Sequence, residues 1–165
     1  MTFDSTWTLQ ARNATGGLTG CGTVAYGTRI TGSGQTIPAH GHILFANVAG
    51  FSESATTPAD GTYMSGIPDA ASVILVHASV TVDALCFYYD MPTESTLDCP
   101  GSPFTCMGTH VLNPHDNTTS TDTNASLERK PGGAQGNTTN TMDNASDFAS
   151  ITTADPHDLA SGPVP

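Results

Sequence analysis

The fold of this chain is restricted most by its apolar residues, which come in short runs separated by turn-forming residues. Residues 7–12 alternate between apolar and polar side chains, and residues 71–77 and 80–89 are rich in apolar side chains. Glycine, proline or asparagine interrupts the best windows for an amphipathic helix. Short runs bounded by turn residues are typical of β-strands. The pattern therefore predicts an all-β protein, either a sandwich or a small barrel.

The pattern also sets the expected order of strands and loops. A tight turn at Ala78 and Ser79 is expected to join two strands as a hairpin, and the continuously apolar run 42–47 is expected to be buried on both faces. Residues 51–68 and 130–144 read as long loops, residues 90–122 as a loop insertion, and residues 152–165 as an extended tail. We expect strands at 7–12, 22–30, 35–37, 42–47, 71–77, 80–89, 124–129 and 147–151.

Length and charge narrow the class of protein. A chain of 165 residues is expected to form one domain. Only Arg12, Arg29, Arg129 and Lys130 are basic, against 15 acidic residues, so the net charge is −11. Binding to nucleic acids and to anionic membranes relies on basic side chains, so we expect neither partner. No apolar run is long enough for a membrane-spanning helix, and the first residues do not read as a signal peptide.

Four cysteines indicate an oxidising compartment, outside the cell or at its surface. Cys99 and Cys106 flank a turn-forming segment, which favours a disulfide between them and leaves Cys21 with Cys86 by exclusion. A buried free thiol is the alternative for Cys86. A zinc site is disfavoured because the chain has no C-x-x-C pair.

The sequence lacks the motifs of common catalytic sites. No nucleophile elbow, phosphate-binding loop or H-E-x-x-H occurs, so we expect no enzyme and no catalytic or cofactor-binding residue. His40 and His42 flank Gly41 in a turn. A metal site there is less favoured than two incidental surface histidines. His77, at the end of an apolar strand, is expected to be a hydrogen-bonded histidine in the core or at its rim.

Calcium is the one cofactor that the loops bring into consideration. Calcium prefers six to eight oxygen ligands, and two loops are rich in aspartate and asparagine. Neither loop matches the calcium-binding loop pattern, and such residues also form side-chain-stabilised turns. Calcium therefore remains a secondary hypothesis, with candidate ligands Asp116, Asp122, Asn124, Asp143 and Asp147.

Five short motifs, in collinear order over residues 5–157, resemble the bacterial lamin tail domain. They are the W-x-L strand at Trp7, the I-P-A-x-G stretch in residues 36–47, the hairpin ending in Val82-Asp83-Ala84, Ser126-Leu127-Glu128-Arg129-Lys130-Pro131, and Asn144-Ala145-Ser146-Asp147-Phe148. The resemblance implies an immunoglobulin-like β-sandwich over residues 1–157 with an extended tail at 158–165. Within this family reading, Arg129 is expected to clamp a loop carboxylate or carbonyl groups, with ligand contact as the alternative.

The chain departs from the family at its beginning, where the family's first strands are missing. Only the five residues from Met1 to Ser5 precede the segment Thr6-Trp7. A sandwich without these strands exposes unpaired backbone groups. Three explanations remain open: the start is misplaced, the chain is part of a longer protein, or a neighbouring chain supplies the strand.

These features together lead to a functional expectation. We expect a non-catalytic structural or adhesive module outside the cell, which assembles with copies of itself or with a surface partner by strand complementation. The alternative is an accessory targeting module of a secreted hydrolase or nuclease, a setting in which the family also occurs.

Overall fold

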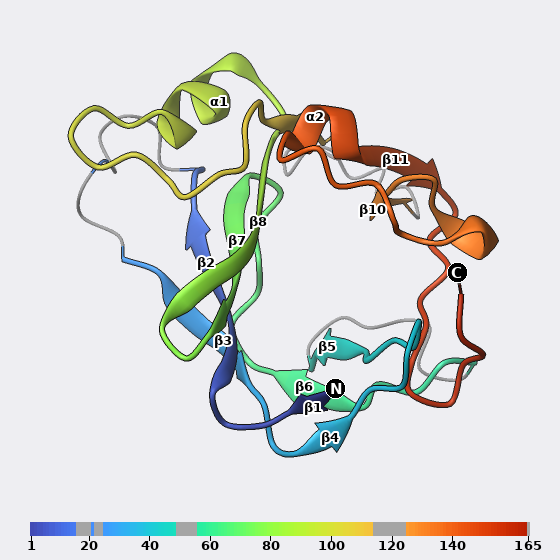
Figure 1. Ribbon diagram of the computed structural model, residues 1–165. Helices are drawn as coiled ribbons and strands as arrows, with labels where there is room; N and C mark the ends of the chain where they lie inside the picture. The colour runs from blue at the N-terminus through green and yellow to red at the C-terminus, as the bar shows by residue number, and fades with distance from the viewer. Residues whose placement is uncertain (16–20, 22–24, 49–55, 114–124, 165) are drawn as a thin grey trace.

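The computed structural model describes residues 1–15, 21, 25–48, 56–113 and 125–164, and its elements are mostly strands (Figure 1). The largest sheet has the strand order β3-β2-β7-β8-β9. Neighbouring strands in it are antiparallel, except for the parallel pair β8–β9. Their bounds are β2 (Trp7–Asn13), β3 (Gly27–Thr31), β7 (Ala71–His77), β8 (Val80–Tyr88) and β9 (Val111–Leu112).

The β7–β8 hairpin is confirmed where the sequence predicts it. Its two turn residues, Ala78 and Ser79, have φ values of 48° and 69°. Positive φ at both central positions gives the turn whose twist matches that of paired strands. The pairing shifts register between Leu75 and Val76, so β8 carries one extra residue there. A similar shift between Leu9 and Gln10 leaves Arg29 as the extra residue of β3.

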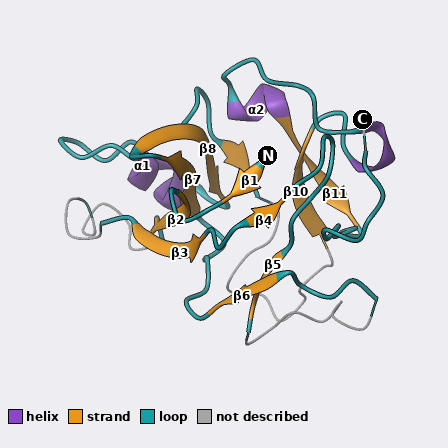
Figure 2. Ribbon diagram, turned by 60° about the horizontal axis from the view of Figure 1, so that its bottom comes forward, coloured by secondary structure: helices purple, strands orange, loops and turns teal. Residues whose placement is uncertain are grey.

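Three short strand pairs complete an all-β sandwich around the main sheet. They are β1 (Thr2–Phe3) with β4 (Gln35–Thr36), the parallel pair β5 (Phe45–Asn47) with β6 (Gly61–Tyr63), and β10 (Ala125–Arg129) with β11 (Phe148–Thr152). In Figure 1 the β1–β4 and β5–β6 pairs lie near the bottom of the view and the β10–β11 hairpin at the upper right, and Figure 2 shows the three pairs from another side.

Apolar clusters pack on both faces of the main sheet. On one face, Cys86 packs in a buried cluster with Leu97, Cys99 and Phe104, which all come from the segment that follows β8. On the other face, Phe87 packs with residues that include Leu127 and Phe148 of the β10–β11 hairpin. Successive residues of a strand point to opposite faces, so β8 holds both layers to the sheet.

Helices occur where loops were expected, which corrects the reading of residues 90–122 and 130–144. Helix α1 (Met91–Leu97) begins at Asp90, whose Oδ1 accepts from the backbone N–H of Thr93 at 2.9 Å. Pro92 lies in the first turn. An aspartate cap followed by proline is a helix-start signal, so the sequence does contain a signal for this helix. A short 3-10 helix (Gly133–Gln135) lies inside the loop expected at 130–144, and helix α2 (Asn144–Asp147) begins at the last residue of that loop.

Three further sequence expectations differ from the structure. The strand expected at 42–47 shortens to β5, because the N–H of Leu44 donates to the Asp60 carboxylate at 2.8 Å. Strand β6 lies inside the loop expected at 51–68. The segment from residue 158 is not simply extended: it turns at Asp158, and the N–H of Leu159 donates to the same Asp60 carboxylate at 3.0 Å.

Within the described part of the chain, no helix is long and apolar enough to span a membrane.

Candidate functional site beside the β10–β11 hairpin

A cleft of about 470 Å³ lies beside the β10–β11 hairpin. Its other walls come from β8 at Asp83, from the segment before β5 and from the C-terminal segment. Its walls combine charged and aromatic groups from segments that are far apart in the sequence. The lining side chains include His42, Asp83, Glu128, Arg129, Phe148, Asp155 and His157. Most of the family-motif residues named from the sequence therefore lie in or beside one cleft.

Arg129 is the central cation of this cleft, and its side chain is 14% exposed. Its Nη2 donates to Asp83 Oδ2 at 2.6 Å, and its Nη1 lies 3.3 Å from Asp147 Oδ2. The same Nη1 donates to the carbonyl of Thr139 at 3.1 Å, and the guanidinium carbon lies 4.5 Å from the ring centre of Phe148. This planar fork clamps two carboxylates and one carbonyl, as the sequence predicted.

Asp147 is the buried partner of Arg129, with a side chain that is 1% exposed. Burial alone raises the pKa of this carboxyl. The hydrogen bonds from the hydroxyl and N–H of Thr141, together with the Arg129 charge, outweigh it, and the pKa is lower than usual. Asp147 therefore stays ionised and holds the segment before α2 against the end of β10.

Glu128 and Lys130 shape the turn that follows β10. Glu128 accepts from the hydroxyl of Ser126 at 2.7 Å and from the N–H of Gly133 at 2.9 Å. Lys130 donates to the carbonyl of Ser146 at 2.7 Å, at the end of α2. The charged groups of the S-L-E-R-K motif thus form bonds inside the fold. This arrangement favours a structural role for the motif over ligand contact.

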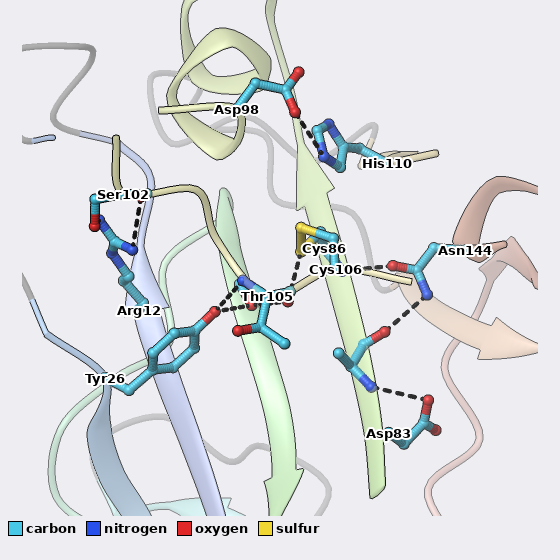
Figure 3. Close-up of a disulfide and its surroundings, with 12 residues drawn as sticks. Arg12, Tyr26, Asp83, Cys86, Asp98, Ser102, Thr105, Cys106, His110 and Asn144 are labelled. Atoms are coloured by element: carbon cyan, nitrogen blue, oxygen red, sulfur yellow. Dashed lines mark hydrogen bonds and ion pairs between the residues drawn. A yellow bond between two sulfur atoms is a disulfide. The ribbon is translucent and has the colours of Figure 1, made fainter. Parts of the chain in front are cut away.

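Asn144 is a site residue that reasoning from the sequence missed. Its side chain is fully buried, accepts from the N–H of Cys86 at 3.0 Å and donates to the carbonyl of Ala84 at 2.8 Å (Figure 3). These are the backbone groups on the outer side of β8, where a further strand would pair. The available signal was the first asparagine of the N-x-x-D-F motif, which was read only as part of the resemblance.

A histidine pair closes the other end of the cleft. The rings of His42 and His157 lie 5.0 Å apart, and His157 Nε2 is 4.0 Å from Asp155 Oδ2. Burial, and next the nearby His157, lower the pKa of His42. The two histidines are more than 100 positions apart in the sequence, so no spacing rule pointed to them.

The lowered pKa of His42 leads to a pH prediction. The folded state binds a proton at His42 less readily than the unfolded chain does, so this contribution to stability is complete above the ordinary histidine pKa of about 6.5 and is lost as the pH falls. We expect the melting temperature to decline between about pH 7 and about pH 5, and His42→Asn to make this decline shallower. His40→Asn is the matched control, because His40 is exposed and is expected to keep the wild-type decline. Equal declines in both variants would contradict the assignment.

The calcium candidates divide into two groups. Asp116, Asp122 and Asn124 lie outside the described residues. Asp143 accepts from the N–H groups of Thr109 and Ser146, each at 2.9 Å, which hold its pKa well below its usual range. Asp147 is bound to Thr141 and Arg129, so both described candidates have protein donors as partners. Among the described residues, no three histidine, cysteine, aspartate or glutamate side chains are placed to hold a metal ion.

The cysteine pairing differs from the one expected. The pairs are Cys21–Cys99, with Cα atoms 5.5 Å apart, and Cys86–Cys106, with Cα atoms 5.4 Å apart. Helix α1 accounts for the difference, because it directs Cys99 into the buried cluster beside Cys21. The turn after Cys99 then carries Cys106 across to β8 (Figure 3). Two disulfides point to an oxidising, extracellular environment.

Side chains of the main sheet hold the segment that joins the two disulfides. Arg12 donates to the carbonyl of Ser102 at 3.1 Å and stacks over Phe104, 3.8 Å from its ring centre. The hydroxyl of Tyr26 accepts from the N–H of Thr105 at 2.8 Å (Figure 3). These contacts account for the buried position of Arg12, which the sequence did not suggest.

Trp7 lies at the rim of the core rather than at its centre. It is half-buried and stacks on His77, with ring centres 4.1 Å apart and ring planes inclined by 12°. His77 itself is exposed, so it lies at the rim rather than in the core.

The described residues form an all-β sandwich with two disulfide-bonded cysteine pairs. No family model, curated protein or solved structure matches this chain.

Proposed function

We propose that this chain is a non-catalytic structural or adhesive module of the lamin tail type, which works outside the cell and assembles with copies of itself. The observation that carries the proposal is the junction centred on Arg129. It joins Asp83 to Asp147 and Phe148, so that together with Arg129 three separate motifs of the resemblance meet there. The charges of the cleft are thereby used to bind layers of the protein to each other, which suits a load-bearing module better than a catalytic one.

The exposed end of β8 supports assembly. Val80 and Val82 are 65% and 48% exposed. Among the described residues, no strand pairs with the outer side of β8 before Phe87. Asn144 covers this side only at Ala84 and Cys86. An exposed strand edge with apolar side chains is a template for a strand from another chain. We propose that a second copy pairs with residues 80–83.

The test is light scattering of the oxidised protein over a range of concentrations. We expect multimers that form more readily as salt rises, because salt screens the repulsion between copies of charge −11. Val80→Lys combined with Val82→Lys is expected to leave a monomer. Met64→Lys, at an exposed apolar residue that directly follows β6, serves as the control and should assemble as the wild type does. A wild-type monomer at every concentration would contradict assembly and favour the accessory-module alternative.

A further inference from the structure

A second cleft, separate from the charged one, has almost entirely apolar walls. It has a volume of about 410 Å³ and lies between the main sheet and the short strand pairs. Leu9, Ile30 and Leu75 form the wall on the sheet side, and Phe3, Phe45 and Tyr63 are among the residues opposite. Pockets for small molecules have volumes of about 300–1,000 Å³ and are mostly apolar with a few polar groups. The cleft has the size and the character of a ligand site.

Arg29 is a charged residue next to two of the residues that line this cleft. As the extra residue of a β-bulge it precedes Ile30, and a bulge redirects a side chain relative to the regular alternation. Its charge lies close enough to Tyr63 to offset part of the rise that burial causes in the pKa of that phenol. Arg29 therefore lies next in the sequence to one lining residue, Ile30, and its charge acts on another, Tyr63.

Arg29 also differs from the other three basic residues in its partners. Arg129 binds two carboxylates, Lys130 binds the end of α2, and Arg12 binds Ser102 and Phe104. Arg29 donates from Nη1 to the carbonyl of Gly27 at 3.1 Å. Its buried Nε, like that of Arg12, meets no acceptor within the described part of the chain. A half-buried guanidinium with an unmet donor and no carboxylate partner there attracts an anion.

We propose that the apolar cleft binds a long-chain monocarboxylate, with the alkyl chain between the two layers and the carboxylate on Arg29. The apolar walls suit the chain, and the guanidinium supplies a complementary charge. A neutral lipid would leave the Arg29 donor unmet. A dianionic headgroup would bring more charge than one guanidinium neutralises. This inference does not depend on the assembly proposed above, and its test uses a different readout.

The test is titration calorimetry of the oxidised protein with octanoate, decanoate and dodecanoate, each below its micelle-forming concentration. We expect a single site whose affinity rises about fourfold for each added methylene, the value for full burial of that group. Arg29→Gln is expected to weaken decanoate about tenfold or more and to leave 1-decanol unchanged, because only the acid uses the charge. Failure to saturate with dodecanoate would overturn the proposal.

Filling the cleft provides the second arm. Ile37→Trp places a larger side chain on the cleft wall outside the regular strands, and Leu75→Trp does so on the sheet. Each variant that keeps the wild-type near-ultraviolet circular dichroism is expected to lose most decanoate binding. Thr8→Val, on the opposite face of β2, is the matched control and should bind as the wild type does. If Ile37→Trp and Arg29→Gln both bind decanoate as tightly as the wild type does, the proposal is overturned.

Discussion

Replacing Arg129 with methionine is expected to lower the free energy of unfolding by about 3 kcal/mol. Methionine keeps the volume of the aliphatic stem but leaves a buried carboxylate at Asp147 without its cation. Losing one partner of a buried ion pair costs much more than the pair itself contributes. Chemical denaturation at neutral pH measures the difference, and Arg29→Met, at a residue with no carboxylate partner among the described residues, is the control with a small expected effect.

The pH dependence of this variant gives an independent check. The folded-state pKa of Asp147 is lowered, so its contribution to stability is complete above the ordinary aspartate pKa of about 3.9 and is lost as the pH falls. We therefore expect the wild type and Arg129→Met to converge in stability in acid. In a double-mutant cycle with Asp147→Asn, the two effects are expected to be strongly non-additive. Additive effects would contradict the clamp.

Removing the Cys21–Cys99 disulfide is the second large effect that we expect. The link closes a loop of 78 residues, and restricting an unfolded chain of that length stabilises the folded state by about 4.5 kcal/mol in the chain-entropy estimate. The Cys86–Cys106 link spans 20 residues and is expected to contribute about 3.3 kcal/mol by the same estimate. Double alanine variants of each pair, compared by denaturant unfolding, measure both values.

Peptide mapping of the unreduced protein identifies the pairs directly. Proteolytic fragments that join Cys21 to Cys99 and Cys86 to Cys106 are expected. A fragment that joins Cys99 to Cys106 would contradict this pairing. The expected difference in unfolding free energy between the two double alanine variants would then disappear as well, because it rests on loops of 78 and 20 residues.

Local patterns predicted the parts of the fold that depend on neighbouring residues. The alternation and turn around Ala78 and Ser79 were sufficient for the β7–β8 hairpin, since its contacts are close in the sequence. Helix α1 was missed although Asp90 and Pro92 signal its start. Apolar periodicity gives no sign of this helix, because a helix of seven residues is too short to display it.

The candidate site could likewise be predicted only in part from the sequence. The motif around Arg129 and the chemistry of a guanidinium predicted a clamp, but nothing in the sequence identified Asp83 as one of its two carboxylates. Neither the pairing of Cys99 with Cys21 nor the contact of His42 with His157 follows any local spacing rule. Such contacts are decided by how the layers pack, and packing is not visible in a single sequence.

The amide of Asn144 has a consequence for the order in which the protein opens. It takes the place of a strand at the edge of β8, but it belongs to the layer that carries β10 and β11. Separating that layer from the main sheet must therefore expose the N–H of Cys86 to water. Hydrogen exchange at this one amide reports the detachment of a whole layer, even though the groups that protect it are only one side chain and its neighbours.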